Sequence, residues 1–168
     1  MKLAEKMLTI EEYFARAFEC ETEFIAGELR PKPLGSPSHS SLCVQLCLLP
    51  ARLAGRARAF IELNLRIGDD VLIPDVCVLR EKKKELPRDA ITEPPQLCIE
   101  VVSPSQRPAE MLAKCERYHE FGVPFCRVID PVSKRGREYH SGSAHLEQTI
   151  SLSAGDLNIS LSELFSEE

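Results

Sequence analysis

Two acidic residues stand in segments that are otherwise apolar. Asp75 follows Pro74 near the head of the apolar run at residues 73–79, and Glu100 lies inside a second apolar run at residues 97–102. Placing a carboxylate in apolar surroundings is costly unless a cation or hydrogen-bond donors compensate it, so such acids are candidates for a functional site. Carboxylate oxygens suit Mg²⁺, which keeps several waters and takes only one or two protein carboxylates. The pair therefore indicates a site where a metal ion could polarise a phosphodiester and activate water.

Plainer interpretations of the same residues stay open, because Asp75 could cap a turn and Glu100 could pair with an arginine. Glu28 could add a third acid, or it could be an exposed strand residue. Lys114 lies beside an apolar helical stripe, so it could reach inward over a sheet. It could also extend along the surface and pair with Glu110, which lies one helical turn earlier.

Other residue types give weaker signals. His39 precedes a predicted helix and could contact a phosphate, or it could simply be a polar cap. The seven cysteines are odd in number and lack a Cys-x-x-Cys pair, which indicates free thiols. Cys77 and Cys98 fit buried small hydrophobes, and a thiol-based metal or redox site is the alternative. No glycine-rich phosphate loop or Gly-x-Ser-x-Gly elbow occurs, which argues against nucleotide-dependent and serine-hydrolase chemistry.

Length and composition favour one domain over residues 1–168, since 43% of the residues are hydrophobic. No apolar stretch reaches the roughly 18 residues of a membrane span, and residues 1–8 do not form a secretory signal, so we expect a cytoplasmic protein. The net charge of −5 gives no global attraction to polyanions. Any nucleic-acid contact must therefore be local, and the candidate basic clusters are Arg52, Arg56 and Arg58, then Lys82, Lys83 and Lys84, then Lys134, Arg135 and Arg137.

Periodicity predicts the elements that position these residues. A capping box at Thr9 and Glu12 predicts a helix over 10–18. Later elements are predicted as two short strands within 23–30 bent at Gly27, a helix over 38–54, a strand over 58–67 that turns into the Asp75 run, a central strand over 97–102, a helix over 108–121 ended by Gly122, a strand over 123–130, weaker strands at 136–140 and 144–151, and a final turn capped by Ser160. This order predicts an α/β or α+β fold with a mixed sheet flanked by helices.

These segments together resemble the Uma2 family, also called DUF820, of nuclease-like proteins. The resemblance is carried by IPDV at 73–76 and IEVVSP at 99–104, and by residues 8–13, 23–29, 36–39, 114–118, 122–124, 128–131 and 161–165. It covers nearly the whole chain and implies the restriction-endonuclease-like PD-(D/E)XK fold, with a central mixed β-sheet flanked by helices.

The resemblance also implies roles for individual residues. Asp75 and Glu100 would be the motif acids, and with the backbone carbonyl of Val101 they would bind Mg²⁺ or Mn²⁺. Val102 stands where the wider motif has a lysine, and Lys114 on the following helix matches the displaced lysine. Glu28 would be the additional acid from the amino-terminal part of the chain.

The implied function is a Mg²⁺-dependent endonuclease that hydrolyses phosphodiester bonds in DNA and could pair into a homodimer. The chain departs from the family pattern at Ala26 and at residues 108–110, which affects substrate contacts and the entry into the helix. The alternative is a catalytically inactive module of the same fold that binds nucleic acid or a protein partner. A direct ion pair between Lys114 and Glu100 without room for a metal would favour that alternative.

Overall fold

The computed structural model describes residues 8–48, 57–80, 85–155 and 157–166. Several predictions lie outside these residues: the absence of a signal in residues 1–7, the end of the predicted helix over 38–54, and the basic residues Arg52, Arg56, Lys82, Lys83 and Lys84. The described elements are α1 (Ile10–Phe14), β1 (Thr22–Ile25), β2 (Glu28–Pro31), α2 (Pro37–Leu48), β3 (Ala57–Ile61), β4 (Leu65–Ile67), β5 (Asp70–Leu72), β6 (Val76–Arg80), β7 (Leu97–Val101), α3 (Pro108–Phe121), β8 (Phe125–Asp130), β9 (Arg135–Glu138), β10 (Glu147–Thr149), β11 (Ser151–Ala154), β12 (Leu157–Ser160) and α4 (Leu161–Leu164).

A six-stranded mixed sheet forms the centre of the fold, in the order β10-β9-β8-β7-β6-β3. β7 and β8 run parallel and are joined through α3, whereas the other neighbours are antiparallel. All five residues of β7 are buried, as a strand covered on both faces requires. Leu97, Ile99 and Val101 pack with α2, and Cys98 packs with α3 on the opposite face. The predicted central strand and the α+β class are therefore confirmed.

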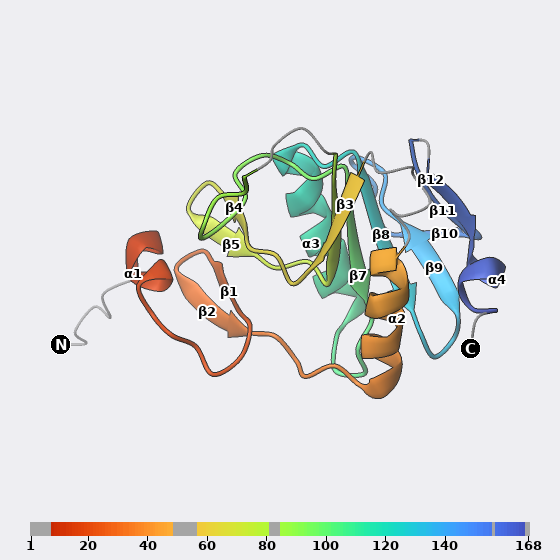
Figure 1. Cartoon of the computed structure of the whole chain (residues 1–168), viewed down its shortest axis with the longest axis horizontal. Coiled ribbons are helices and arrows are strands. Elements are labelled where there is room, and N and C mark those ends of the chain that lie inside the picture. The colour runs from red at the N-terminus through yellow and green to blue at the C-terminus, as the bar shows by residue number, and fades with distance from the viewer. Residues whose placement is uncertain (1–7, 49–56, 81–84, 156, 167–168) are drawn as a thin grey trace.

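A second sheet of four antiparallel strands, in the order β2-β1-β5-β4, lies at the end of the molecule where α1 is found (Figure 1). It is held to α1 by a small core in which Ile10 and Tyr13 pack on Phe24 and Val71. Figure 1 shows β9 to β12 and α4 at the other end of the molecule. β1 pairs with β5, and the chain continues from β5 through residues 73–75 into β6 of the central sheet.

Three element predictions differ from the structure. The strand predicted over 58–67 is two strands, because Glu62 has a φ of 53° and turns the chain from β3 in the central sheet to β4 in the smaller one. The helix predicted over 10–18 ends at Phe14 although its capping box is present. The strand predicted over 144–151 is divided, because β10 of the central sheet ends at Thr149 and β11 begins at Ser151 and pairs with β12, which was not predicted, in a sheet of two strands. The helix over 108–121 is confirmed and ends at Gly122, whose φ of 107° is left-handed.

The cysteines are free thiols, as their spacing predicted. Cys77, Cys98 and Cys126 are neighbours across β6, β7 and β8, buried in the core beneath α3. Burial raises the pKa of the Cys77 thiol to about 12, which is opposite to the shift of a reactive or metal-binding thiol. Among the described helices, none has the length and apolar character needed to cross a membrane.

Candidate active site

Strand pairing brings Asp75 and Glu100 to one end of the central sheet. β6 and β7 are antiparallel with Val76 opposite Ile99, so the residue that precedes β6 meets the carboxyl end of β7. The Val101 backbone N–H donates to Asp75 Oδ2 at 2.7 Å. Only 2% of Asp75 and 1% of Glu100 are exposed, so both acids are buried.

α3 supplies the partners of Glu100. Lys114 Nζ lies 2.9 Å from Glu100 Oε1, and the Tyr118 hydroxyl donates to the same oxygen at 2.5 Å. Lys114 and Tyr118 are four residues apart and therefore share the helix face that lies over the sheet. Lys114 thus reaches inward, as one of its two interpretations predicted, and its ion pair with Glu100 is direct.

The third acid in contact with this site is Glu23 of β1, which the sequence analysis did not single out. Glu23 Oε1 lies 2.8 Å from Lys114 Nζ and accepts the Ile73 backbone N–H at 2.9 Å. The structure places Glu28 outside the group, because β2 is the outer edge strand of the smaller sheet. The Glu28 side chain is 72% exposed and pairs with Arg30 at 3.3 Å.

Two further side chains, those of Lys32 and His39, approach Asp75. Lys32 Nζ donates to Asp75 Oδ1 at 2.7 Å and to the Ile73 carbonyl at 2.9 Å. His39, in the first turn of α2, places Nε2 3.4 Å from Asp75 Oδ2. His39 had been considered for phosphate contact, whereas Lys32 lies in a proline-rich segment without periodicity and carried no signal. We call Glu23, Lys32, His39, Asp75, Glu100, Lys114 and Tyr118 the acid–lysine cluster.

The cluster shifts the pKa values of its members in different directions. Burial alone would raise the pKa of Asp75, but the hydrogen bond with His39 and the charge of Lys32 outweigh it and hold that pKa well below its usual range. For Glu100 burial prevails over the attraction of Lys114, and the negative charge of Asp75 adds to it, so the pKa is raised to about 7. Burial lowers the pKa of Lys114, but Glu100 and Glu23 together raise it, so its ammonium stays charged.

The residue types in the cluster fit a hard divalent cation, since Asp75 and Glu100 offer carboxylate oxygens and Mg²⁺ needs only one or two. The oxygens of these two carboxylates are already engaged by groups of the chain itself: Lys32 and Val101 bind Asp75, and Lys114 binds Glu100. Within the described residues, no three His, Cys, Asp or Glu side chains converge as ligands of one metal ion. Val101 contacts Asp75 through its backbone N–H, whereas the resemblance implied that its backbone carbonyl would bind the metal. A metal ion would therefore have to exchange with a cation already present.

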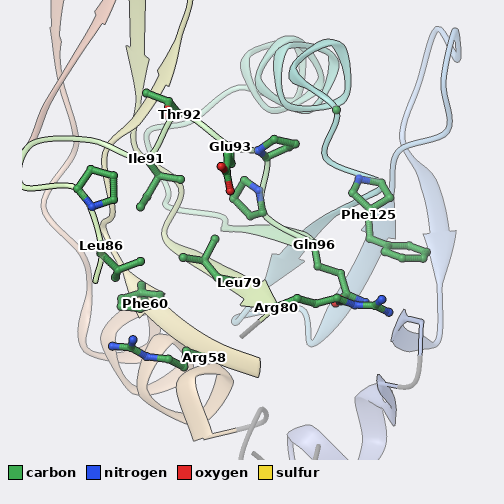
Figure 2. A pocket seen from close by; sticks show the side chains of 15 residues that line it. Arg58, Phe60, Leu79, Arg80, Leu86, Ile91, Thr92, Glu93, Gln96 and Phe125 are labelled. Atoms are coloured by element: carbon green, nitrogen blue, oxygen red, sulfur yellow. Dashed lines mark hydrogen bonds between the residues drawn. The ribbon is translucent and has the colours of Figure 1, made fainter. Parts of the chain in front are cut away.

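A separate cavity of about 500 Å³ lies at the opposite end of β6, where Arg80 ends the strand. Figure 2 shows Phe60, Leu79, Ile91 and Phe125 around it, from the central sheet and the segment that precedes β7. Asp75 and Glu100 do not line this cavity. The apolar hollow and the acid–lysine cluster are thus distinct regions of the molecule.

Comparison with known proteins agrees with this architecture. Residues 10–167 match the model of the Uma2 family, which is described as "Putative restriction endonuclease". A similar solved structure is a "putative nuclease belonging to DUF820" from Anabaena variabilis ATCC 29413, at 22% identity, with 95% of this chain and 98% of that chain covered and a TM-score of 0.81. No curated protein matched the chain. The structural likeness confirms the predicted nuclease fold, and the family match extends through every element that carries the acid–lysine cluster. The chain belongs to the Uma2 family.

Proposed function

We propose that this chain is a divalent-metal-dependent endonuclease that hydrolyses phosphodiester bonds in DNA. The observation that carries the proposal is the convergence of two buried carboxylates, Asp75 and Glu100, at the adjoining ends of β6 and β7, with Lys114 beside them. Two acids and a lysine at the end of two paired strands supply both cation ligands and a fixed positive charge. The family match supports the same reaction class.

In this proposal Asp75 and Glu100 hold Mg²⁺ or Mn²⁺. When bound, the ion would polarise a phosphoryl oxygen and lower the pKa of a bound water. Tyr118 fixes the orientation of Glu100 through its hydrogen bond, and Glu23 fixes Lys114 from the other side.

Lys114 is the residue placed to stabilise negative charge that develops on the phosphoryl group. Its ammonium binds Glu23 and Glu100 at 2.8 and 2.9 Å, whereas its distance to the Ile73 carbonyl is 3.5 Å. That last contact is at the outer limit of a hydrogen bond, so this N–H is the one most easily turned toward a substrate oxygen.

A basic segment supports DNA as the substrate despite the acidic net charge. β7 and β8 are parallel, so the turn from β8 to β9 lies at the same end of the sheet as Glu100. Lys134 is exposed in this turn, and β9 begins with the exposed Arg135 and also carries Arg137. Contacts of this kind with phosphates would hold a nucleic acid near the cluster, and two copies of the chain could then engage two strands. A cytoplasmic location is part of the same proposal.

A catalytically inactive module that binds nucleic acid or a protein partner is the second candidate. The observation that favours it is the closure of the cluster: Lys114 pairs directly with Glu100, and Lys32 pairs with Asp75. Both carboxylates are compensated by the chain's own cations, so this arrangement is also a stable buried ion network.

Cleavage assays separate the two candidates. We expect the purified chain to cleave duplex DNA with Mg²⁺ or Mn²⁺ and not with a chelator, and we expect Glu100→Gln and Lys114→Met each to reduce the rate at least about 100-fold. Single-stranded DNA and RNA should be tested in parallel. Glu28→Gln is the matched control and should cleave at the wild-type rate.

Equal cleavage by Glu100→Gln would reveal a contaminating nuclease and contradict the assignment. Absence of cleavage, combined with retained binding to DNA, would support the inactive module.

A further inference from the structure

Lys32 occupies a position that a metal ion would be expected to take. Its ammonium lies 2.7 Å from Asp75 Oδ1 and 2.9 Å from the Ile73 carbonyl, and only 7% of its side chain is exposed. A carboxylate oxygen beside a backbone carbonyl oxygen is a ligand combination suited to a hard cation. A buried ammonium in that place provides the same charge compensation with one positive charge.

We propose that Lys32 is an internal competitor of the divalent metal ion for Asp75. This inference rests on the proposed function in one respect, the assignment of Asp75 as a metal ligand. In the closed cluster the Lys32 ammonium fills the coordination position, and metal binding requires that this side chain leave Asp75. The apparent affinity for the metal is then the intrinsic affinity multiplied by the fraction of molecules in which Lys32 has left Asp75.

The two lysines of the cluster differ in how firmly they are held. Lys114 is fixed on the middle of α3 between two carboxylates. Lys32 follows β2 in a connecting segment, and its backbone N–H is anchored to the Glu21 carbonyl at 2.8 Å. Its side chain can therefore swing out on its flexible stem without movement of the main chain. Lys32 is the cation that can be exchanged.

The charge balance favours exchange over addition. A metal ion binds its carboxylate ligands only in their ionised form, and with Glu23 also ionised three carboxylates then face the two ammonium groups of Lys32 and Lys114. One negative charge remains, and a divalent ion added to this set would leave a buried positive charge. Replacement of Lys32 by a divalent ion neutralises the cluster, which is the state of lowest desolvation cost.

Direct titration with Mn²⁺ tests the proposal without an activity measurement. Calorimetry on the full chain would compare the wild type with Lys32→Met, which keeps an unbranched side chain and removes the charge. We expect Lys32→Met to bind Mn²⁺ at least about tenfold more tightly. Arg30→Met is the matched control. It also removes a positive charge, but from an exposed side chain two residues before Lys32, so this variant should bind Mn²⁺ as the wild type does.

Equal Mn²⁺ affinity of the wild type and Lys32→Met overturns the competition while leaving the proposed function intact. Failure of both folded proteins to bind Mn²⁺ overturns both proposals.

A second measurement uses only the wild-type chain, so it does not depend on the folding of a variant. By linkage, saturating Mn²⁺ should release Lys32 and increase its acetylation by an amine-reactive reagent, as read by mass spectrometry. Lys114 should stay protected, and exposed Lys134 should be labelled equally with and without the metal. Unchanged labelling of Lys32 at saturating Mn²⁺ would contradict its displacement.

Discussion

Glu100 illustrates how one side chain responds to opposed influences. It is 1% exposed, which disfavours its ionised form, while Lys114 and Tyr118 donate hydrogen bonds that favour it. Burial prevails, and the pKa is raised from 4.5 to about 7. A carboxyl group that titrates near neutral pH makes the stability of the chain sensitive to pH in the physiological range.

We therefore expect the free energy of unfolding to fall as the pH rises. The folded chain binds the Glu100 proton more tightly than the unfolded chain, so the contribution is fully present below pH 4.5 and is lost as the pH rises through about 7. The expected loss is about 3 kcal/mol. Asp75, whose pKa is lowered, affects stability only at more acidic pH. Urea unfolding between pH 5 and 8 would measure the slope.

The matched variant for this pH dependence is Glu100→Gln, which has no proton to lose. We expect its free energy of unfolding to vary much less over the same pH range. An identical slope in the variant would show that another group causes it.

At the level of residues, the sequence was sufficient to place part of the cluster. The apolar runs around Asp75 and Glu100 showed that both acids would be buried, and the helical stripe beside Lys114 allowed an inward orientation. Glu23 and Lys32 could not be found in this way. Glu23 reaches Lys114 across 91 positions of sequence, and Lys32 reaches Asp75 across 43, so no local pattern records either contact.

Among the elements, α3 has the most distinct boundaries. Pro108 occupies its first turn, and the Glu110 carboxylate accepts the Arg107 N–H at 3.2 Å. At the other end the Gly122 N–H donates to the His119 carbonyl, and its φ of 107° ends the helix. A Cβ atom at Gly122 would lie 3.3 Å from Pro94. The end of the helix that carries Lys114 therefore requires glycine for two reasons.

We expect Gly122→Ala to destabilise the chain by about 2 kcal/mol or more, since the left-handed conformation alone costs an alanine about 1 kcal/mol. Gly68→Ala is the matched control. Gly68 has a φ of 64° in the turn from β4 to β5, and nothing lies within 4 Å of the added atom. Urea unfolding of both variants measures the difference. Equal losses would show that contact with Pro94 contributes nothing.

The elements also show where local patterns are informative and where they are not. The helix over 108–121 could be predicted because proline, apolar spacing and glycine all agree within its own residues. The strand over 58–67 was wrongly predicted as continuous, since its alternation persists through Glu62 while the backbone there turns from one sheet to another. Which sheet a strand joins depends on partners distant in sequence, and alternation does not identify them.

In the molecule as a whole, α3 joins the smaller sheet to the central one. Lys114 binds Glu23 of β1, and Arg117 forms an ion pair with Asp70 of β5. Asp70 also accepts the Ala26 backbone N–H at 2.8 Å, at the turn between β1 and β2. The polar contacts that build the candidate site are therefore also contacts between the two sheets.

We expect Glu23→Gln to lower the free energy of unfolding by about 2 kcal/mol, because it removes a charged partner from buried Lys114. Glu28→Gln, on the exposed edge strand, should change it by less than about 0.5 kcal/mol. Thermal and urea unfolding would compare the two variants directly. Similar effects of both substitutions would contradict a joining role for Glu23.

The hydrogen bond from Val101 to Asp75 has one more consequence. β6 begins at Val76, so no strand residue of β6 stands opposite Val101, and the side chain of Asp75 takes the place of the next rung of the ladder. The Asp75 carboxylate thereby ends the pairing of β6 with β7 and is also part of the acid–lysine cluster. The rate at which the Val101 amide exchanges its proton with solvent is then set by a side chain, and this amide is a built-in reporter of whether Asp75 is engaged.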